Sequence, residues 1–255
     1  MVEMTEYASG TPSWLDVSTP DMAATKAFYG GLFGWEAMTY PEMGGYTNFT
    51  VRGKLVCGAA PTQSPDQHPA WSTYISVDDA DATAQAVQEN GGHLIFPPMD
   101  VMELGRMAIF QDPTGAYCGI WQPGQHKGAQ VVMEPGSFGW TELDTRDMDA
   151  AKAFYTKVFS WTAKTDGEGE SAYTEWQLDG RSIAGGMQMG SQFPADVPPN
   201  WLPYFVVTDS DATVAKVKEL GGAVMMPGMD VDEGRVAVVA DPHGAVFATI
   251  QPPSR

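Results

Sequence analysis

The sequence predicts an α+β fold made of four βαβββ motifs, which pair into two tandem modules with cupped mixed sheets. Three observations predict it: one block of sequence recurs about 126 residues later, each copy alternates strand-like with helix-like segments, and glycines or Asp-Pro turns separate these segments. Hydrophobic residues make up 43% of the chain and aromatic residues 11%, which is enough to fill buried cores. We therefore expect two folded modules and no long disordered region.

The internal repeat is the main evidence for two tandem modules. The two copies align without gaps in their first block, where about half of the positions are identical, including the tryptophan that begins each copy. The matching segments are 14–35 with 140–161, 71–92 with 201–222, and 112–123 with 241–252. Self-similarity in a fixed register over about 120 residues indicates two copies of one unit.

Each copy opens with a predicted strand and a predicted helix. The segments 14–18 and 140–144 alternate in the period of a half-buried strand. Ala24 and Phe28 then recur at helical spacing. Asp21 stands near the start of that segment, where a carboxylate favours the helix dipole.

The rest of each copy is predicted in the same way. Two strands turn at Gly53 and Gly180, and a single strand follows over 72–77 or 202–208. A second helix ends at a Gly-Gly pair, because glycine accepts the left-handed conformation found after helices. The last two strands join through Asp-Pro-x-Gly, whose residues suit a tight turn.

These elements divide the chain into a first module, a linker and a second module. We place the first module at 8–123 and the second at 137–253. The linker, 124–136, is bounded by proline and glycine.

Composition excludes several classes of function. A formal charge of −18 with 14 scattered basic residues argues against a nucleic-acid partner. No apolar run approaches the roughly 20 residues that cross a bilayer, so no membrane partner is expected. The amino terminus lacks the features of a secretory signal. Two cysteines, Cys57 and Cys118, are too few for a disulfide framework, so we expect buried free thiols and a cytoplasmic location.

The motif D-M-x-A-x-K-A-F-Y, found at 21–29 and 147–155, and the D-P-x-G turns resemble the vicinal oxygen chelate superfamily. That superfamily holds glyoxalase I, bleomycin-resistance and fosfomycin-resistance proteins, and extradiol dioxygenases. The resemblance implies two glyoxalase-like modules, each with a cupped sheet. In the enzymes of the group, His, Gln or Glu from the first, fourth and last strands hold a divalent metal that acts as a Lewis acid.

The aligned positions of this chain do not carry such ligands. The first-strand position falls on Trp14 in the first copy and on Trp140 in the second. The fourth-strand position falls on Ser72 and Leu202, and the last-strand position falls on Gly119 and Ala248. An indole offers only an N–H donor, and Leu, Gly and Ala offer no donor atom. The four histidines form no cluster, and His126 of the linker is interpreted as an exposed loop residue. We therefore predict no metal ligands and no cofactor, with a divalent metal as the alternative.

Strand alternation places a carboxylate on the same face as each of these tryptophans. Asp16 shares a face with Trp14, and Glu142 shares a face with Trp140. The tryptophans either plug the cups or stack on a ligand, and both interpretations stay open. Asp16 and Glu142 are the candidate catalytic residues, as general bases with pKa values raised by burial. The predicted ligand-binding residues are Trp14, Trp140, Tyr74, Tyr204, Ser72, Trp71 and Trp201.

The favoured function is a small-molecule-binding protein of the bleomycin-resistance type, which takes an aromatic or amphipathic metabolite or antibiotic. Methionine-rich stretches at 97–107 and 225–229 are interpreted as loops that overhang the cups and adapt to such a ligand. One alternative is a metal-independent hydroxylase-like or isomerase-like enzyme on the same scaffold. The other is a metal-dependent glyoxalase or dioxygenase. A monomer is favoured, with a homodimer as the alternative, because the duplication already supplies the paired modules.

Overall fold

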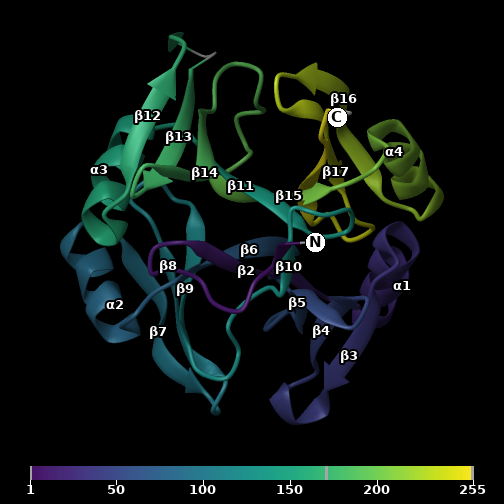
Figure 1. Cartoon of the computed structure of the whole chain (residues 1–255), viewed down its shortest axis with the longest axis horizontal. Coiled ribbons are helices and arrows are strands. Elements are labelled where there is room, and N and C mark those ends of the chain that lie inside the picture. Colours follow the sequence, from purple (N-terminus) through teal and green to yellow (C-terminus); the bar gives the residue numbers. More distant parts are fainter. Residues whose placement is uncertain (1, 170–171, 254–255) are drawn as a thin grey trace.

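The chain folds into two curved mixed β-sheets, one for each copy of the repeat, with four helices at their flanks (Figure 1). The computed structural model describes residues 2–169 and 172–253. The first sheet contains, in spatial order, β3 (Glu36–Tyr40), β4 (Tyr46–Val51), β5 (Lys54–Pro61), β2 (Pro12–Thr19), β6 (Ala70–Ser76), β9 (Tyr117–Pro123), β8 (Gly105–Gln111) and β7 (His93–Val101).

The second sheet repeats this order with the same connections. It contains β12 (Thr162–Asp166), β13 (Tyr173–Leu178), β14 (Arg181–Gln188), β11 (Phe138–Thr145), β15 (Asn200–Val206), β18 (Val246–Gln251), β17 (Gly234–Ala240) and β16 (Ala223–Val231). The helices are α1 (Met22–Phe33), α2 (Ala80–Glu89), α3 (Met148–Phe159) and α4 (Ser210–Glu219). Each sheet joins two βαβββ motifs through an antiparallel pair at its centre, which confirms the predicted α+β fold of tandem modules.

Local sequence explains where the helices begin and end. Asp21 has an extended backbone, and its carboxylate accepts hydrogen bonds from the amides of Ala23 and Ala24 at 2.9 and 3.0 Å, which caps α1. The helix ends at Gly34, whose φ of 72° is left-handed and costs glycine little. In the second copy, Ser160 takes this left-handed position after α3.

Helices of one module pack against helices of the other. α2 and α3 lie together at one flank of the molecule, and α1 and α4 lie together at the opposite flank (Figure 1). Each of the two large cores therefore draws its residues from both copies. The tyrosine of each D-M-x-A-x-K-A-F-Y motif forms a hydrogen bond to an aspartate of the other module. The Tyr155 hydroxyl donates to the Asp112 carboxylate at 2.9 Å, and the Tyr29 hydroxyl donates to the Asp241 carboxylate at 3.2 Å.

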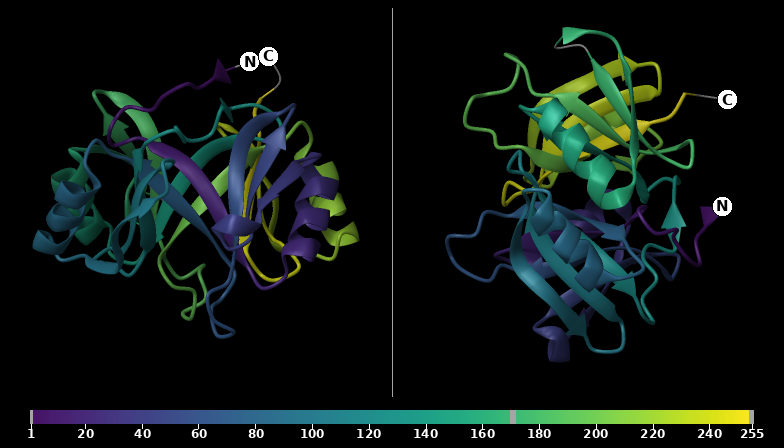
Figure 2. Two further views of the ribbon diagram at one scale, coloured as in Figure 1. Left: turned by 90° about the horizontal axis from the view of Figure 1, so that it is seen from below. Right: turned by 90° about the vertical axis from the view of Figure 1, so that its left-hand side faces the viewer.

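The outer strands of the sheets differ from the sequence prediction. The edge strands β3 and β12 were not predicted individually. The methionine-rich stretches lie mainly in strands β7, β8 and β16 instead of in overhanging loops. Met102, at the β7–β8 turn, is 69% exposed, whereas Met226 packs against the concave side of the second sheet. The loops 62–69 and 189–199 project from one end of the molecule, opposite the chain termini (Figure 2).

Other predictions are tested by the same structure. Cys57 and Cys118 are free and buried, as expected. The short strand β10 (Val131–Val132) lies within the predicted linker and pairs with β1 (Val2–Glu3) and β11. In the part of the chain that the structure describes, no helix combines the length and apolar character needed to cross a membrane.

Candidate functional site

The helices cover one face of each sheet, and the opposite, concave face carries the candidate site residues. We call the concave faces the first cup and the second cup. Trp14, Tyr74 and Trp121 form an apolar cluster in the first cup, separate from the cores shared between modules. Tyr204 and Trp140 belong to the corresponding cluster in the second cup. Strand alternation therefore places the tryptophans that begin each copy where the sequence predicted them.

A hydrogen-bond network occupies the floor of the first cup. The Trp14 indole N–H donates to the Tyr46 hydroxyl at 2.8 Å, and that hydroxyl donates to Asp16 Oδ2 at 3.3 Å. The Tyr74 hydroxyl donates to the same oxygen at 3.1 Å. Burial raises the pKa of Asp16 to about 6, although both phenols act to lower it.

The second cup repeats this network with a longer carboxylate. Trp140 donates to the Tyr173 hydroxyl at 3.0 Å, and Tyr204 donates to Glu142 Oε1 at 2.9 Å. Tyr173 is also hydrogen-bonded to Glu142. Burial raises the pKa of Glu142, and its hydrogen bonds act in the opposite direction.

Asp144 distinguishes the second cup from the first. It stands two residues after Glu142 on the same face of β11, and the two carboxyls are hydrogen-bonded to each other. Burial, followed by the charge of Glu142, raises the pKa of Asp144 well above its usual range, which favours a proton shared between the two carboxyls. Its other oxygen, Oδ1, is buried and has no hydrogen-bond partner among the described residues. The first cup has Ser18 at this position, and its hydroxyl bonds the backbone of Ala70.

Glycine positions explain how tyrosines fill these cups. A Cβ at Gly58 would overlap the Tyr46 hydroxyl oxygen, and one at Gly185 would overlap that of Tyr173. A Cβ at Gly119 would overlap the Tyr74 ring. At Gly119, a position predicted for a metal ligand, the space that a ligand side chain would need is thus taken by a phenol.

The donor set does not fit the metal site that the resemblance implies. The residue directly beside Trp14 on the fourth strand is Tyr74, and Ser72 lies beside Asp16. Tyr204 stands likewise beside Trp140, and Leu202 beside Glu142. The last strand contributes Gly119 beside Tyr74. Among the described residues, no three His, Cys, Asp or Glu side chains form a group able to hold a metal ion. The side chains of both cups are therefore suited to hydrogen bonding and stacking.

The linker covers the first cup. His126 lies with its ring centroid 4.4 Å from that of Trp14 and 5.5 Å from that of Trp121. The Trp121 indole donates to the His126 carbonyl at 2.8 Å, which fixes the segment in place. Burial lowers the pKa of His126 to about 4. The interpretation of His126 as an exposed loop residue is therefore wrong.

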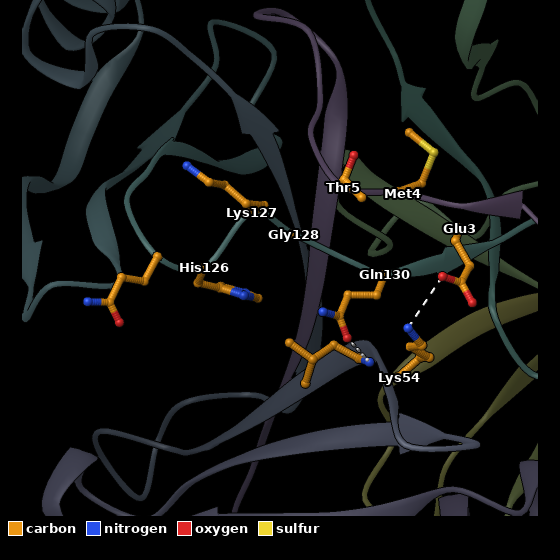
Figure 3. Close-up of a pocket in the computed structure, with 10 residues that line it drawn as sticks. Glu3, Met4, Thr5, Lys54, His126, Lys127, Gly128 and Gln130 are labelled. Atoms are coloured by element: carbon orange, nitrogen blue, oxygen red, sulfur yellow. Dashed lines mark hydrogen bonds and ion pairs between the residues drawn. The ribbon is translucent and has the colours of Figure 1, made fainter.

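A small cavity lies beside this cover, between the N-terminal segment, the start of β5 and the linker (Figure 3). Its volume is about 220 Å³, and Glu3, Lys54, His126 and Gln130 are among the residues that line it. Lys54 is paired with Glu3 at 3.3 Å, and Lys127 is a further basic residue of the lining.

The second cup has no comparable cover within the described residues. Ile250 stands where the first cup has Trp121, and Trp140 makes no ring–ring contact among the described aromatic side chains. Trp140 remains partly exposed, whereas only 5% of the Trp14 surface is accessible. Tyr173 and its counterpart Tyr46 are both partly exposed. The second cup therefore presents an accessible aromatic surface above a buried acidic pair.

Two of the predicted ligand-binding residues lie on the wrong face for either cup. Trp71 and Trp201 are buried in the cores shared between modules, where their indoles donate to Tyr29 and Tyr155 at 3.0 and 2.9 Å. Ser72 lies on the concave side opposite Asp16 and is partly exposed.

Sequence reasoning missed the two tyrosines that link each indole to its carboxylate. Tyr46 and Tyr173 occupy equivalent places in the repeat, in Y-T-N-F and Y-T-E-W. A pairwise comparison of the two copies on these strands would have identified both.

Comparison with known proteins identifies the same fold in both halves. Residues 11–118 match the model of the glyoxalase/bleomycin resistance protein/dioxygenase superfamily, and residues 140–250 match a glyoxalase-like domain. The chain is 41% identical to the anthracycline biosynthesis protein DauV of Streptomyces sp. (strain C5), over 97% of this chain and 95% of that protein. It is 39% identical to the putative glyoxylase CFP32 of Mycobacterium bovis, over 99% and 98% of the two chains.

Solved structures share the fold at low sequence identity. The Mn(II)-bound glyoxalase of Novosphingobium aromaticivorans superposes with a TM-score of 0.67 at 14% identity, over 95% of this chain and 82% of that one. The 2,3-dioxygenase LapB of Pseudomonas sp. KL28 superposes with a TM-score of 0.67 at 12% identity, over 96% and 94% of the two chains.

Proposed function

The chain belongs to the glyoxalase/bleomycin resistance protein/dioxygenase superfamily, and on that premise we propose that it binds a planar aromatic small molecule in its second cup. The observation that carries this proposal is the difference between the two cups. His126 covers the tryptophan of the first cup, whereas Trp140 of the second cup is partly exposed. An accessible indole offers a large flat surface for stacking at little cost in conformational entropy.

The surroundings of Trp140 suit such a ligand. Leu202, Val236 and Met226 line the second cup with apolar side chains, and the flexible Met226 adapts to different ring systems. Tyr204 and Glu142 provide polar atoms at the floor. Ligand sites in proteins commonly combine an apolar lining with a few convergent polar groups.

The relatives support an aromatic ligand of a particular kind. Two proteins that are each 41% identical to this chain are named for anthracycline biosynthesis, DauV and DnrV. We propose that this chain takes a ligand of the same chemical class, a fused-ring aromatic natural product, and that its role is binding. Sequestration of such a compound requires no metal.

Calorimetric titration with an anthracycline tests this function. The variant Trp140→Leu removes the stacking surface, and Trp14→Leu is the matched control in the covered cup. We expect binding to the wild type, at least tenfold weaker binding to Trp140→Leu, and an unchanged Kd for Trp14→Leu. Thermal unfolding establishes that each variant is folded. Equal weakening by both substitutions, or no binding to the wild type, would contradict the proposal.

A metal-independent enzyme is the second candidate, and the buried acidic pair favours it. Glu142 is held by two phenols and by the carboxyl of Asp144, an arrangement that suits a general base with an acid beside it. Product analysis of the bound aromatic compound, with and without Glu142→Gln, separates catalysis from binding. Turnover by the wild type that disappears in Glu142→Gln while binding persists supports the enzyme. Unchanged compound in both reactions supports binding alone.

A further inference from the structure

The pair Glu142–Asp144 is a feature that aromatic stacking alone does not require. Both residues are 3% exposed, and they follow the partly exposed Trp140 on the same face of β11, Glu142 at two residues and Asp144 at four. Burying two carboxyls side by side is costly unless a proton or a cation neutralises part of their charge. The hydrogen bond between Asp144 and Glu142 requires a proton on one of the two carboxyls, and the raised pKa of Asp144 favours its retention.

No basic side chain of the described residues neutralises the charge of Glu142 and Asp144. Among residues 2–169 and 172–253, none of the ion pairs involves Glu142 or Asp144. Arg235 is instead engaged by Asp211 and Asp230, and Arg146 by backbone carbonyls. Among the described residues, the hydrogen-bond partners of the two carboxyls are therefore phenols and each other, with no cation beside them.

The unpartnered oxygen of Asp144 lacks a hydrogen-bond donor, and a ligand could supply one. Asp144 lies on the concave face with Glu142, and its Oδ1 is a buried acceptor without a donor among the described residues. Tyr173 and Tyr204 already donate to Glu142, so neither hydroxyl serves Asp144 in this arrangement. A ligand that brings several N–H donors to this place would satisfy Oδ1 and take over the role of the shared proton.

We propose that the ligand of the second cup carries a protonated amine, which donates to Asp144 and Glu142 while its aromatic rings stack on Trp140. This inference rests on the proposed function and specifies the ligand class. The ammonium replaces the shared proton, which leaves to solvent, and the site then holds one cation against two carboxylates. The formal charge of −18 attracts cations to the whole molecule, and the face of Trp140 adds a favourable cation–π contribution.

The test compares two ligands that differ only in the charged group, aminomethyl-anthracene and hydroxymethyl-anthracene, each titrated by calorimetry near neutral pH. We expect the amine to bind the wild type at least tenfold more tightly than the alcohol. Asp144→Ser installs the residue that the first cup has at this position but leaves Glu142, so we expect it to reduce this preference at least fivefold while the alcohol still binds. Asp16→Asn, in the covered first cup, is the matched control and should leave the preference intact.

The outcomes separate this inference from the proposed function. If both compounds bind the wild type with the same Kd, the amine proposal is refuted and aromatic binding stands. If neither binds, the proposed function fails together with it. A preference for the amine that Asp144→Ser leaves undiminished, or one that Asp16→Asn removes, would place the cation elsewhere and also refute the proposal. Equal wild-type affinities refute the proposal even if a variant fails to fold. If Asp144→Ser does not fold, Asp144→Asn, which keeps the shape of the side chain without its charge, is titrated in its place.

Discussion

Replacement of Asp16 by asparagine is expected to stabilise the protein, and the gain should grow with pH. Burial raises the pKa of Asp16 from its usual 3.8 to about 6 in the folded chain. A group whose pKa is raised on folding contributes stability at low pH, and that contribution is lost as the pH rises through the folded value. The rise to about 6 corresponds to a cost of about 3 kcal/mol once Asp16 is ionised. About 1.4 kcal/mol of this cost accumulates between pH 5 and pH 8.

The amide introduced by Asp16→Asn keeps an oxygen that can accept from Tyr46 and Tyr74 but carries no charge. The assay is urea unfolding of the wild type and the variant at pH 5 and at pH 8. The free energy of unfolding of the variant, relative to the wild type, should increase by about 1.4 kcal/mol between these two pH values. Other titrating groups, His126 among them, are present in both proteins and cancel in the difference. A difference that stays constant with pH would refute the assignment of a raised pKa to Asp16.

Three further predictions concern packing, the linker and metals. Gly119→Ala places a methyl group against the Tyr74 ring and should lower the free energy of unfolding by about 1–3 kcal/mol. An unchanged free energy in urea unfolding would contradict this. His126→Ala should uncover the first cup and increase the quenching of tryptophan fluorescence by acrylamide. Unchanged quenching would show that the His126 imidazole does not shield Trp14. Dialysis against EDTA should change neither the thermal midpoint of unfolding nor the Kd for an anthracycline. If elemental analysis found a stoichiometric transition metal, and EDTA removed both the metal and the binding of the anthracycline, this prediction would be contradicted.

The fold was predictable because duplication makes the sequence its own alignment. Equivalent strands, helix caps and Asp-Pro turns appear twice, so each element is supported by two independent segments. Strand alternation placed Asp16 beside Trp14 and Glu142 beside Trp140, as the structure shows. The roles of these residues in binding or catalysis stay predictions.

Other features depend on packing that a linear pattern does not contain. The contact of Tyr155 with Asp112 joins residues of different modules, and sequence spacing gives no distance between them. The position of His126 over Trp14 depends on the path of the linker. The assignment of Trp71 to the cup was an error of a different kind, because alternation with Tyr74 already puts it on the opposite face.

A crystal structure of the full chain with a bound anthracycline tests the central claim most directly. We expect density for the fused rings against the indole of Trp140 in the second cup, with a polar group of the ligand directed at Glu142. Ligand density against Trp14 with His126 displaced, or in the cavity beside the linker, would contradict this claim. A ligand bound to a metal ion that other side chains hold would also contradict it.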